Sequence, residues 1–422
     1  MNRPLVGWDL ATWRITQSDP GLSANVVAVA EIAGWVEKSH LLPRIELLLE
    51  TYPVLKMGVK DSLPIELDFL PNFKPEQYVY DESVNILELA ANLSRMQIGY
   101  DECLWRLHVV HRNSKTYLVT AIHHAIADGN TAMLFLQTLL DEPQFPEIQS
   151  GQKSNDIDVY EELKQGAGKI VNRLTRDPVG LAKDLSQMLQ SVNRIISLDI
   201  SDRISVEDSN LTAKLYKLDK RQLQNFVKGK GISNHDVMAG VIVSSLQKYF
   251  EVDKLGRKNL VVNIPVAMNL DDAVSNKLVV ARIDFEIEPQ PVTAVMQYSR
   301  EKLRNWRKEP GLSIAAHLIN ASALIPIDLI TKAIKNADAT ISTLVGGATS
   351  KRMFGFEVKA VWPLVPPIGA GLNFTTVAMG EYVYAGITID NAKISDLDRW
   401  QRVFEQTYFE VFGTKIFEQI FE

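Results

Sequence analysis

Apolar and polar residues along the chain follow two periodicities, which predict a mixture of strands and helices. Alternating or short continuous apolar runs indicate strands. We expect strands at 25–32, 104–111, 117–124, 214–217, 260–265, 279–287, 354–361 and 382–389. Apolar residues spaced three or four positions apart indicate helices. We expect helices at 35–52, 84–96, 131–140, 221–228, 234–250, 292–307, 314–333 and 399–418.

The middle of the chain divides this pattern in two. A polar stretch at 149–155 is followed by residues 159–197, where charged and apolar positions alternate in a helical way with a break at 178–180. We interpret this segment as a connector, because a new compact pattern begins near Leu211. Strands and helices mix on both sides of it, which predicts layered α/β or α+β subdomains at 1–195 and 196–422.

Composition agrees with a soluble globular protein. The 422 residues permit about two or three domains, and the hydrophobic share of 46% and charged share of 23% are ordinary. The 45 basic and 51 acidic residues leave a net charge of −6. Without a basic excess, we do not expect nucleic acid to be a partner.

Three absences narrow the cellular setting and the chemistry. Cys103 is the one cysteine, so the chain forms no internal disulfide framework and no cysteine-rich metal site. The first twenty residues carry charges and lack the apolar core of a signal peptide. No uninterrupted apolar run approaches the length of a transmembrane helix. We therefore expect a cytoplasmic protein.

Two adjacent histidines, His123 and His124, end a predicted strand and give the most informative segment of the chain. Neighbouring strand residues point to opposite faces, so the two rings cannot readily bind one metal ion. One ring is expected to face the core and the other a cavity. A neutral imidazole in a cavity is suited to accept a proton from a hydroxyl or an amine near neutral pH.

The residues after the pair support a site at this strand end. Gly129 would allow a sharp turn into the next helix, and the small Ala125 and Ala127 would leave room for a substrate. Asp128 could cap that helix or pair with an arginine. The alternative is that both histidines are core residues and that Asp128 is only a helix cap.

The segment from His123 to Gly129 resembles the HHxxxDG motif of the superfamily that contains chloramphenicol acetyltransferase-like acyltransferases and peptide-synthetase condensation domains. Within it, the chain resembles the wax ester synthase/bacterial diacylglycerol acyltransferase family over nearly its whole length. Three further segments carry this resemblance. Cys103-Leu104-Trp105 stands where the family usually has Pro-Leu-Trp, and Asp236 to Gly240 resembles the family's helix that contains Asn-Asp-Val. Val361 to Asn373 resembles the family's C-terminal Pro-Leu-Val-Pro segment.

The resemblance implies a fold and a mechanism. The fold would be two chloramphenicol acetyltransferase-like subdomains with a tunnel between them. His124 would be the general base for attack on an acyl thioester, and the rest of the catalytic motif would be His123, Asp128 and Gly129. Substrate-binding roles are implied for Trp105, Asp236, Pro363 and Asn373. Acyl-CoA would be a co-substrate, with no bound cofactor and no metal.

Departures from the family pattern leave the substrates open. His235 replaces an Asn, Cys103 replaces a Pro, and residues 342–347 keep only part of a Ser-Asn-Val-Pro-Gly-Pro segment. The acceptor could be a hydroxyl or an amine on a small molecule or a lipid, and a lipid would bring peripheral membrane contact. Residues 362–372 either line an acyl channel or pack between two layers.

Two other functions are kept beside the O-acyltransferase. One is a condensation-type enzyme that forms amides or esters from an acyl group on a carrier protein, in natural-product biosynthesis. The other is a non-catalytic binding protein built on the same scaffold. Comparing acyl-CoA with acyl carrier protein as donors would separate the O-acyltransferase from the condensation-type enzyme. No product with any donor would favour the binding protein.

Overall fold

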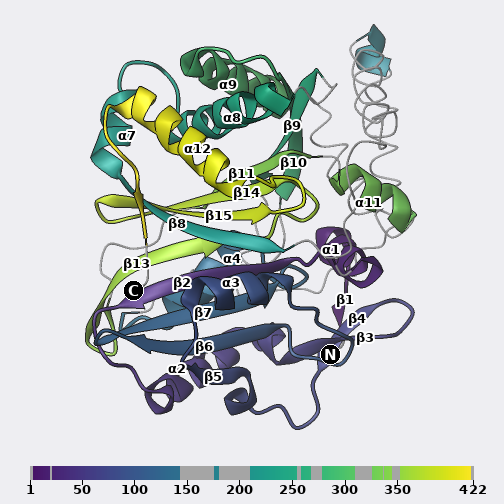
Figure 1. Cartoon of the computed structure of the whole chain (residues 1–422). Helices are drawn as coiled ribbons and strands as arrows, with labels where there is room; N and C mark the ends of the chain where they lie inside the picture. Colours follow the sequence, from purple (N-terminus) through teal and green to yellow (C-terminus); the bar gives the residue numbers. More distant parts are fainter. Residues whose placement is uncertain are drawn as a thin grey trace.

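The computed structural model describes residues 3–19, 21–142, 175–179, 210–253, 258–267, 278–308, 326–335, 337–344 and 352–419. Within these residues the chain forms two large sheets and one small sheet, with helices packed against them (Figure 1). The mixed strand and helix architecture predicted from the sequence is confirmed. No helix in the described part of the chain is long and apolar enough to cross a membrane.

The first large sheet has six strands in the order β12-β13-β2-β7-β6-β5. Its strands are β12 (Arg352–Met353), β13 (Phe356–Leu364), β2 (Asn25–Ile32), β7 (Lys115–His123), β6 (Trp105–Arg112) and β5 (Val79–Glu82). The predicted hairpin is β6 and β7, which pair antiparallel. Because β13 pairs with β2, a strand from late in the chain completes this sheet.

Helices and a small sheet surround the first sheet. The helices are α1 (Gly7–Ser18), α2 (Lys38–Thr51), α3 (Ile86–Arg95) and α4 (Gly129–Thr138), with the short 3-10 helices η1 (Pro53–Lys56) and η2 (Pro75–Tyr78). The small sheet contains β1 (Arg3–Pro4), β4 (Glu66–Phe69) and β3 (Met57–Lys60). Side chains of α2 and α4 pack on the face of β7 that carries Ile122. The opposite face carries His123 and meets α1.

The second large sheet has seven strands in the order β10-β9-β11-β14-β15-β8-β16. Its strands are β10 (Leu278–Glu286), β9 (Asn259–Ala267), β11 (Ala339–Leu344), β14 (Leu372–Met379), β15 (Tyr382–Asp390), β8 (Leu211–Asp219) and β16 (Phe417–Glu418). The helices in this half are α7 (Lys220–Val227), α8 (Asn234–Asp253), α9 (Val292–Lys308), α11 (Ile327–Lys335) and α12 (Leu397–Phe412). Figure 1 shows α8, α9 and α12 together over one face of this sheet.

The two large sheets meet where β13 crosses β15 and β8. The indole nitrogen of Trp362 donates a hydrogen bond to the carbonyl oxygen of Tyr216 at 3.1 Å, and the side chain is buried. Backbone contact is equally close nearby, because a Cβ atom at Gly386 would lie 1.8 Å from the carbonyl oxygen of Pro363. Only glycine therefore fits at this crossing.

Several predicted elements need correction. The predicted helix 399–418 is too long, because Gly413 takes a left-handed conformation (φ 69°) and ends α12 at Phe412. The helix α1 and the strands β11 and β14 were not predicted. In β14, polar Asn and Thr residues interrupt the apolar pattern and a Pro-Gly-rich segment precedes it. Residues 362–364 belong to β13 and pack between the sheets.

Some predictions fall outside the described residues. Most of the connector at 159–197, the first part of the helix expected at 314–333 and the division at 195/196 lie there. The subdomain boundaries therefore stay predictions.

Candidate active site

His123, the last residue of β7, is fixed inside the core. Its side chain is 1% exposed, and its ring lies edge-on to Trp13 with the centroids 5.3 Å apart. Nδ1 accepts a hydrogen bond from the backbone N–H of Ala125 at 3.0 Å, and Nε2 lies 3.2 Å from Oγ1 of Thr16. The Thr16 hydroxyl donates within α1 to backbone carbonyl oxygens, so it accepts from Nε2. These contacts assign the proton of a neutral ring to Nε2.

Burial keeps this ring uncharged. Desolvation is the larger cause, and the neighbouring His124 the smaller, of a shift that lowers the pKa of His123 to about 3. A ring without access to solvent and with both nitrogens engaged has no room for a substrate. We conclude that His123 positions the motif by fixing the turn after β7.

His124 is held by its backbone, and the residue is partly exposed. Its N–H donates to the carbonyl oxygen of Ala24 on the neighbouring chain segment at 2.9 Å. The N–H of His123 donates to the carbonyl oxygen of Leu104 at 2.8 Å, and the N–H of Ile126 donates to the carbonyl oxygen of His123 at 3.1 Å. The residue as a whole is partly exposed, between the buried His123 and Ala125, whereas Nδ1 of its ring is buried. A histidine on a fixed backbone with partial exposure is compatible with a general base.

Asp128 and Gly129 form the beginning of α4. The carboxylate of Asp128 accepts a hydrogen bond from the N–H of Thr131 at 2.8 Å, so it caps the helix. Gly129 is the first residue of α4 and does not have a positive φ, so its predicted role in a sharp turn stays a prediction. A Cβ atom at this position would lie 2.5 Å from Cδ2 of Leu344 in β11, so a larger residue would have to displace that side chain. The motif thus touches the second large sheet.

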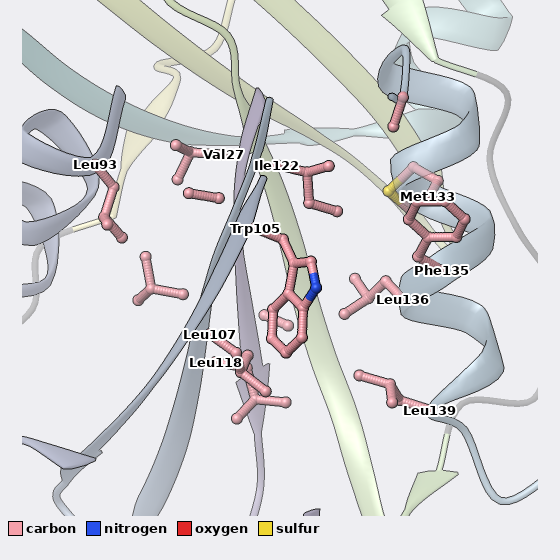
Figure 2. Packing of buried hydrophobic residues seen from close by; sticks show 14 of the residues in the cluster. Val27, Leu93, Trp105, Leu107, Leu118, Ile122, Met133, Phe135, Leu136 and Leu139 are labelled. Carbon is pink, nitrogen blue, oxygen red and sulfur yellow. The ribbon is translucent and has the colours of Figure 1, made fainter. Parts of the chain in front are cut away.

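Trp105 borders an apolar cavity next to the motif. Its indole nitrogen donates to the carbonyl oxygen of Leu55 at 2.8 Å. The cavity measures about 40 Å³ and lies between β6, β7, α2 and α4. Its lining includes Ile122, which precedes His124 by two positions, and Ala132 and Leu136 of α4. Figure 2 shows Trp105 between the strands and α4, with Leu136 facing it.

The other three residues with predicted substrate contacts have structural partners. Asp236 accepts hydrogen bonds from the backbone and hydroxyl of Ser233, both at 2.8 Å, in a capping box that begins α8. Pro363 is buried at the crossing of the two sheets. Asn373 is buried and accepts a hydrogen bond from the Thr375 hydroxyl at 2.7 Å. Their roles in substrate binding stay predictions.

Sequence reasoning missed the partners that fix the motif. Thr16 and Trp13 lie on α1, which no periodic pattern predicted, and they contact His123 across more than a hundred positions of sequence. Leu344 likewise meets Gly129 from the other half of the chain. His235, singled out as a departure from the family pattern, lies at the start of α8. Its Nδ1 is 3.0 Å from the Thr343 hydroxyl, and burial lowers its pKa.

The described residues show neither a metal centre nor a reactive thiol. They contain no group of three or more His, Cys, Asp or Glu side chains placed to hold a metal ion. Cys103 is buried, and its Sγ lies 3.6 Å from the carbonyl oxygen of Trp105. Burial raises the pKa of this thiol to about 12, so it stays protonated near neutral pH.

The buried His123 should make the fold sensitive to acid. Its folded pKa of about 3 lies below the unfolded value of 6.5, so the unfolded chain binds a proton first. This contribution to stability is present above pH 6.5 and is lost as the pH falls toward 3. Relative to His123→Gln, the wild-type protein should lose about 2 kcal/mol between pH 7 and pH 5 in urea unfolding. An equal pH dependence for both proteins would contradict the assignment.

Two models of one protein family match the chain. The model of the wax ester synthase/diacylglycerol acyltransferase catalytic domain matches residues 82–212, which include the histidine pair. The C-terminal domain model of the same family matches residues 275–411. Together the two models match more than half of the chain.

Solved structures share the fold at low sequence identity. One is the wax ester synthase/diacylglycerol acyltransferase from Marinobacter aquaeolei VT8, with a TM-score of 0.60 and 15% identity over 97% of this chain and 98% of that one. Another is the starter condensation domain of rhizomide synthetase RzmA, with a TM-score of 0.61 and 12% identity over 98% and 95%. Both likenesses show the two-subdomain, chloramphenicol acetyltransferase-like fold.

A curated relative by sequence is the polyketide synthase PksN of Bacillus subtilis (strain 168). It is 21% identical over 314 residues, which cover 70% of this chain. The chain spans only 6% of the length of that protein.

Proposed function

Because the chain belongs to the wax ester synthase/diacylglycerol acyltransferase family, we propose that it transfers an acyl group from acyl-CoA to a hydroxyl, with His124 as the general base. The observation that carries this proposal is the division between the two histidines. His123 is locked in the core by bonds to both ring nitrogens, whereas His124 keeps partial access on a fixed backbone.

The proposed reaction needs one base and no covalent acyl-enzyme. The imidazole of His124 removes the proton from the acceptor hydroxyl while its oxygen bonds to the thioester carbonyl carbon. The tetrahedral intermediate then collapses, the carbon–sulfur bond breaks, and the proton passes from His124 to the departing sulfur. Backbone N–H groups in the first turn of α4 are the candidate donors to the oxyanion, because a helix N-terminus favours negative charge. Asp128 fixes the start of α4 and takes up the N–H of Thr131, which is therefore not one of these donors.

The apolar cavity beside Trp105 is suited to the acyl chain. It lies on the face of β7 that carries Ile122, and β7 ends at His123, the residue before His124. Its volume of about 40 Å³ is close to that of one or two water molecules. A long acyl chain would therefore require side chains such as Leu136 and Leu139 to move, whereas a short one would fit with less adjustment.

A condensation-type reaction is the second candidate. It is favoured by the structural likeness to the rhizomide synthetase starter condensation domain and by the sequence likeness to the polyketide synthase PksN. One structure of that condensation domain is described as a complex with C8-CoA and Leu-SNAC. In such a reaction the attacking group would be an amine or a hydroxyl and the donor a carrier-bound thioester.

The test is a donor and acceptor panel read by mass spectrometry. Purified protein is incubated with acyl-CoAs of increasing chain length and with alcohols, amines and diacylglycerol, beside the same acyl groups on a carrier protein. We expect an ester from acyl-CoA and an alcohol. An amide formed only from the carrier-bound donor would favour condensation, and no product from any donor would favour a non-catalytic binding protein.

A further inference from the structure

The apolar cavity beside Trp105 follows one face of α4. Its lining includes Ala132, Leu136 and Leu139, whose spacing places them on the same side of the helix. Figure 2 shows Leu136 and Leu139 pointing from α4 toward the strands. Along the helix axis, Ala132 and Leu139 are separated by about 10 Å, which is close to the length of an extended octanoyl chain. The cavity therefore runs from the end of α4 near the histidine motif toward its other end.

That other end of α4 is held by Asp141. One carboxylate oxygen accepts a hydrogen bond from the N–H of Phe354 at 2.7 Å, and the other accepts from the N–H of Gly355 at 2.8 Å. The N–H of Asp141 donates to the carbonyl oxygen of Arg352 at 2.8 Å. Phe354 and Gly355 form the turn between β12 and β13. Three bonds, two of them to a charged group, thus attach the end of α4 to the edge of the first large sheet.

Arg44 joins the same point to α2, which forms another wall of the cavity. Its Nη1 donates to the carbonyl oxygen of Leu140 at 3.1 Å, and its Nη2 lies 3.4 Å from Oδ1 of Asp141. The guanidinium carbon lies 6.0 Å from the centroid of the Phe354 ring. The residue after Arg44 is Ile45, which lines the cavity. Arg44 and Asp141 therefore form a clasp that connects α2, α4 and the β12–β13 turn.

We propose that this clasp limits the acyl chain that the protein accepts to about the length of an octanoyl group. The inference rests on the proposed function, because it takes the cavity as the acyl site. The start of α4 follows the histidine motif, whose backbone is bonded to Ala24 and Leu104. With both ends held, α4 cannot move away from α2, and a close-packed interior does not admit further methylene groups. Opening the clasp would free the end of α4 and lengthen the cavity.

The test compares the binding of octanoate and dodecanoate by calorimetry. Asp141→Ala removes the bonds to the turn, and Arg44→Gln removes the link to α2. Each variant should bind dodecanoate at least about tenfold more tightly than the wild-type protein does, because each methylene group that becomes buried strengthens binding about fourfold. Octanoate affinity should not change, because octanoate already fits the clasped cavity.

The matched control is Asp101→Asn, which removes the carboxylate bonded to Lys60 of β3. Asparagine tolerates the left-handed backbone at this position (φ 58°). This variant should bind both fatty acids as the wild-type protein does. The side chains of Arg44 and Asp141 are each 29% exposed, so removing either one leaves no fully buried charge, and we expect both clasp variants to fold.

Three results would overturn the inference. The first is a preference for octanoate over dodecanoate that both clasp variants retain. The second is weaker binding of both fatty acids by the variants, which would show that the clasp only supports the fold. The third is no binding of octanoate by the wild-type protein, because the clasp would then close no acyl site. Because binding is measured without transfer, a shift toward dodecanoate in variants of a protein that forms no ester would support the clasp and contradict the acyltransferase.

Discussion

Replacing His124 by alanine is expected to lower kcat for acyl transfer by about 10²–10⁴-fold, the usual contribution of a general base. The reason is that the imidazole would take the acceptor proton as the carbon–oxygen bond forms, and alanine has no group that can. His123 cannot substitute, because its ring is buried and both nitrogens are engaged. The measurement is the initial rate of thiol release with saturating acyl-CoA and alcohol.

The control for this variant is His40→Ala, which removes an exposed histidine from α2. It should transfer acyl groups at the wild-type rate. The residue His124 is partly exposed, so His124→Ala should also keep a melting temperature close to that of the wild-type protein. A kcat within threefold of wild type in His124→Ala would contradict the general-base assignment.

Gly386→Ala is expected to cause the largest loss of stability, about 3 kcal/mol or more. The added Cβ would lie 1.8 Å from the carbonyl oxygen of Pro363 and 2.9 Å from its carbonyl carbon. Both are backbone atoms within paired strands, so relief requires β13 and β15 to separate where the two sheets meet. The measurement is the urea midpoint of unfolding.

The matched control is Gly99→Ala, where the nearest atom to an added Cβ is the flexible carboxylate of Glu102 at 3.3 Å. Its urea midpoint should stay near that of the wild-type protein. Equal midpoints for Gly386→Ala and Gly99→Ala would contradict the close backbone approach of β15 to β13.

Local pattern was enough to predict the strand that carries the motif. The alternation before His123 predicted β7, and the same alternation predicted that the two rings point to opposite faces. The structure places His123 on the core side. The pattern could not predict which residues hold His123 there. Its partner Thr16 lies on α1, where this polar side chain can be buried because its hydroxyl bonds to backbone carbonyl oxygens of the same helix.

Residues whose roles depend on long-range contact were the least predictable. Gly129 was expected to shape a turn, but the constraint on it comes from Leu344, more than two hundred positions later. Asp236 matched a family segment, yet the structure uses its carboxylate to cap α8. A capping box can be recognised in a sequence as Ser-x-x-Asp, and Ser233 and Asp236 have this spacing. The sequence therefore also contained the pattern that predicts the cap of α8.

The separate roles of the two adjacent histidines can be tested by one measurement. Ester formation is followed by mass spectrometry for His124→Gln and wild type, with each rate expressed per folded molecule. We expect a rate at least a hundredfold lower for His124→Gln, at an unchanged melting temperature. Ester formation by folded His124→Gln at the wild-type rate would contradict it.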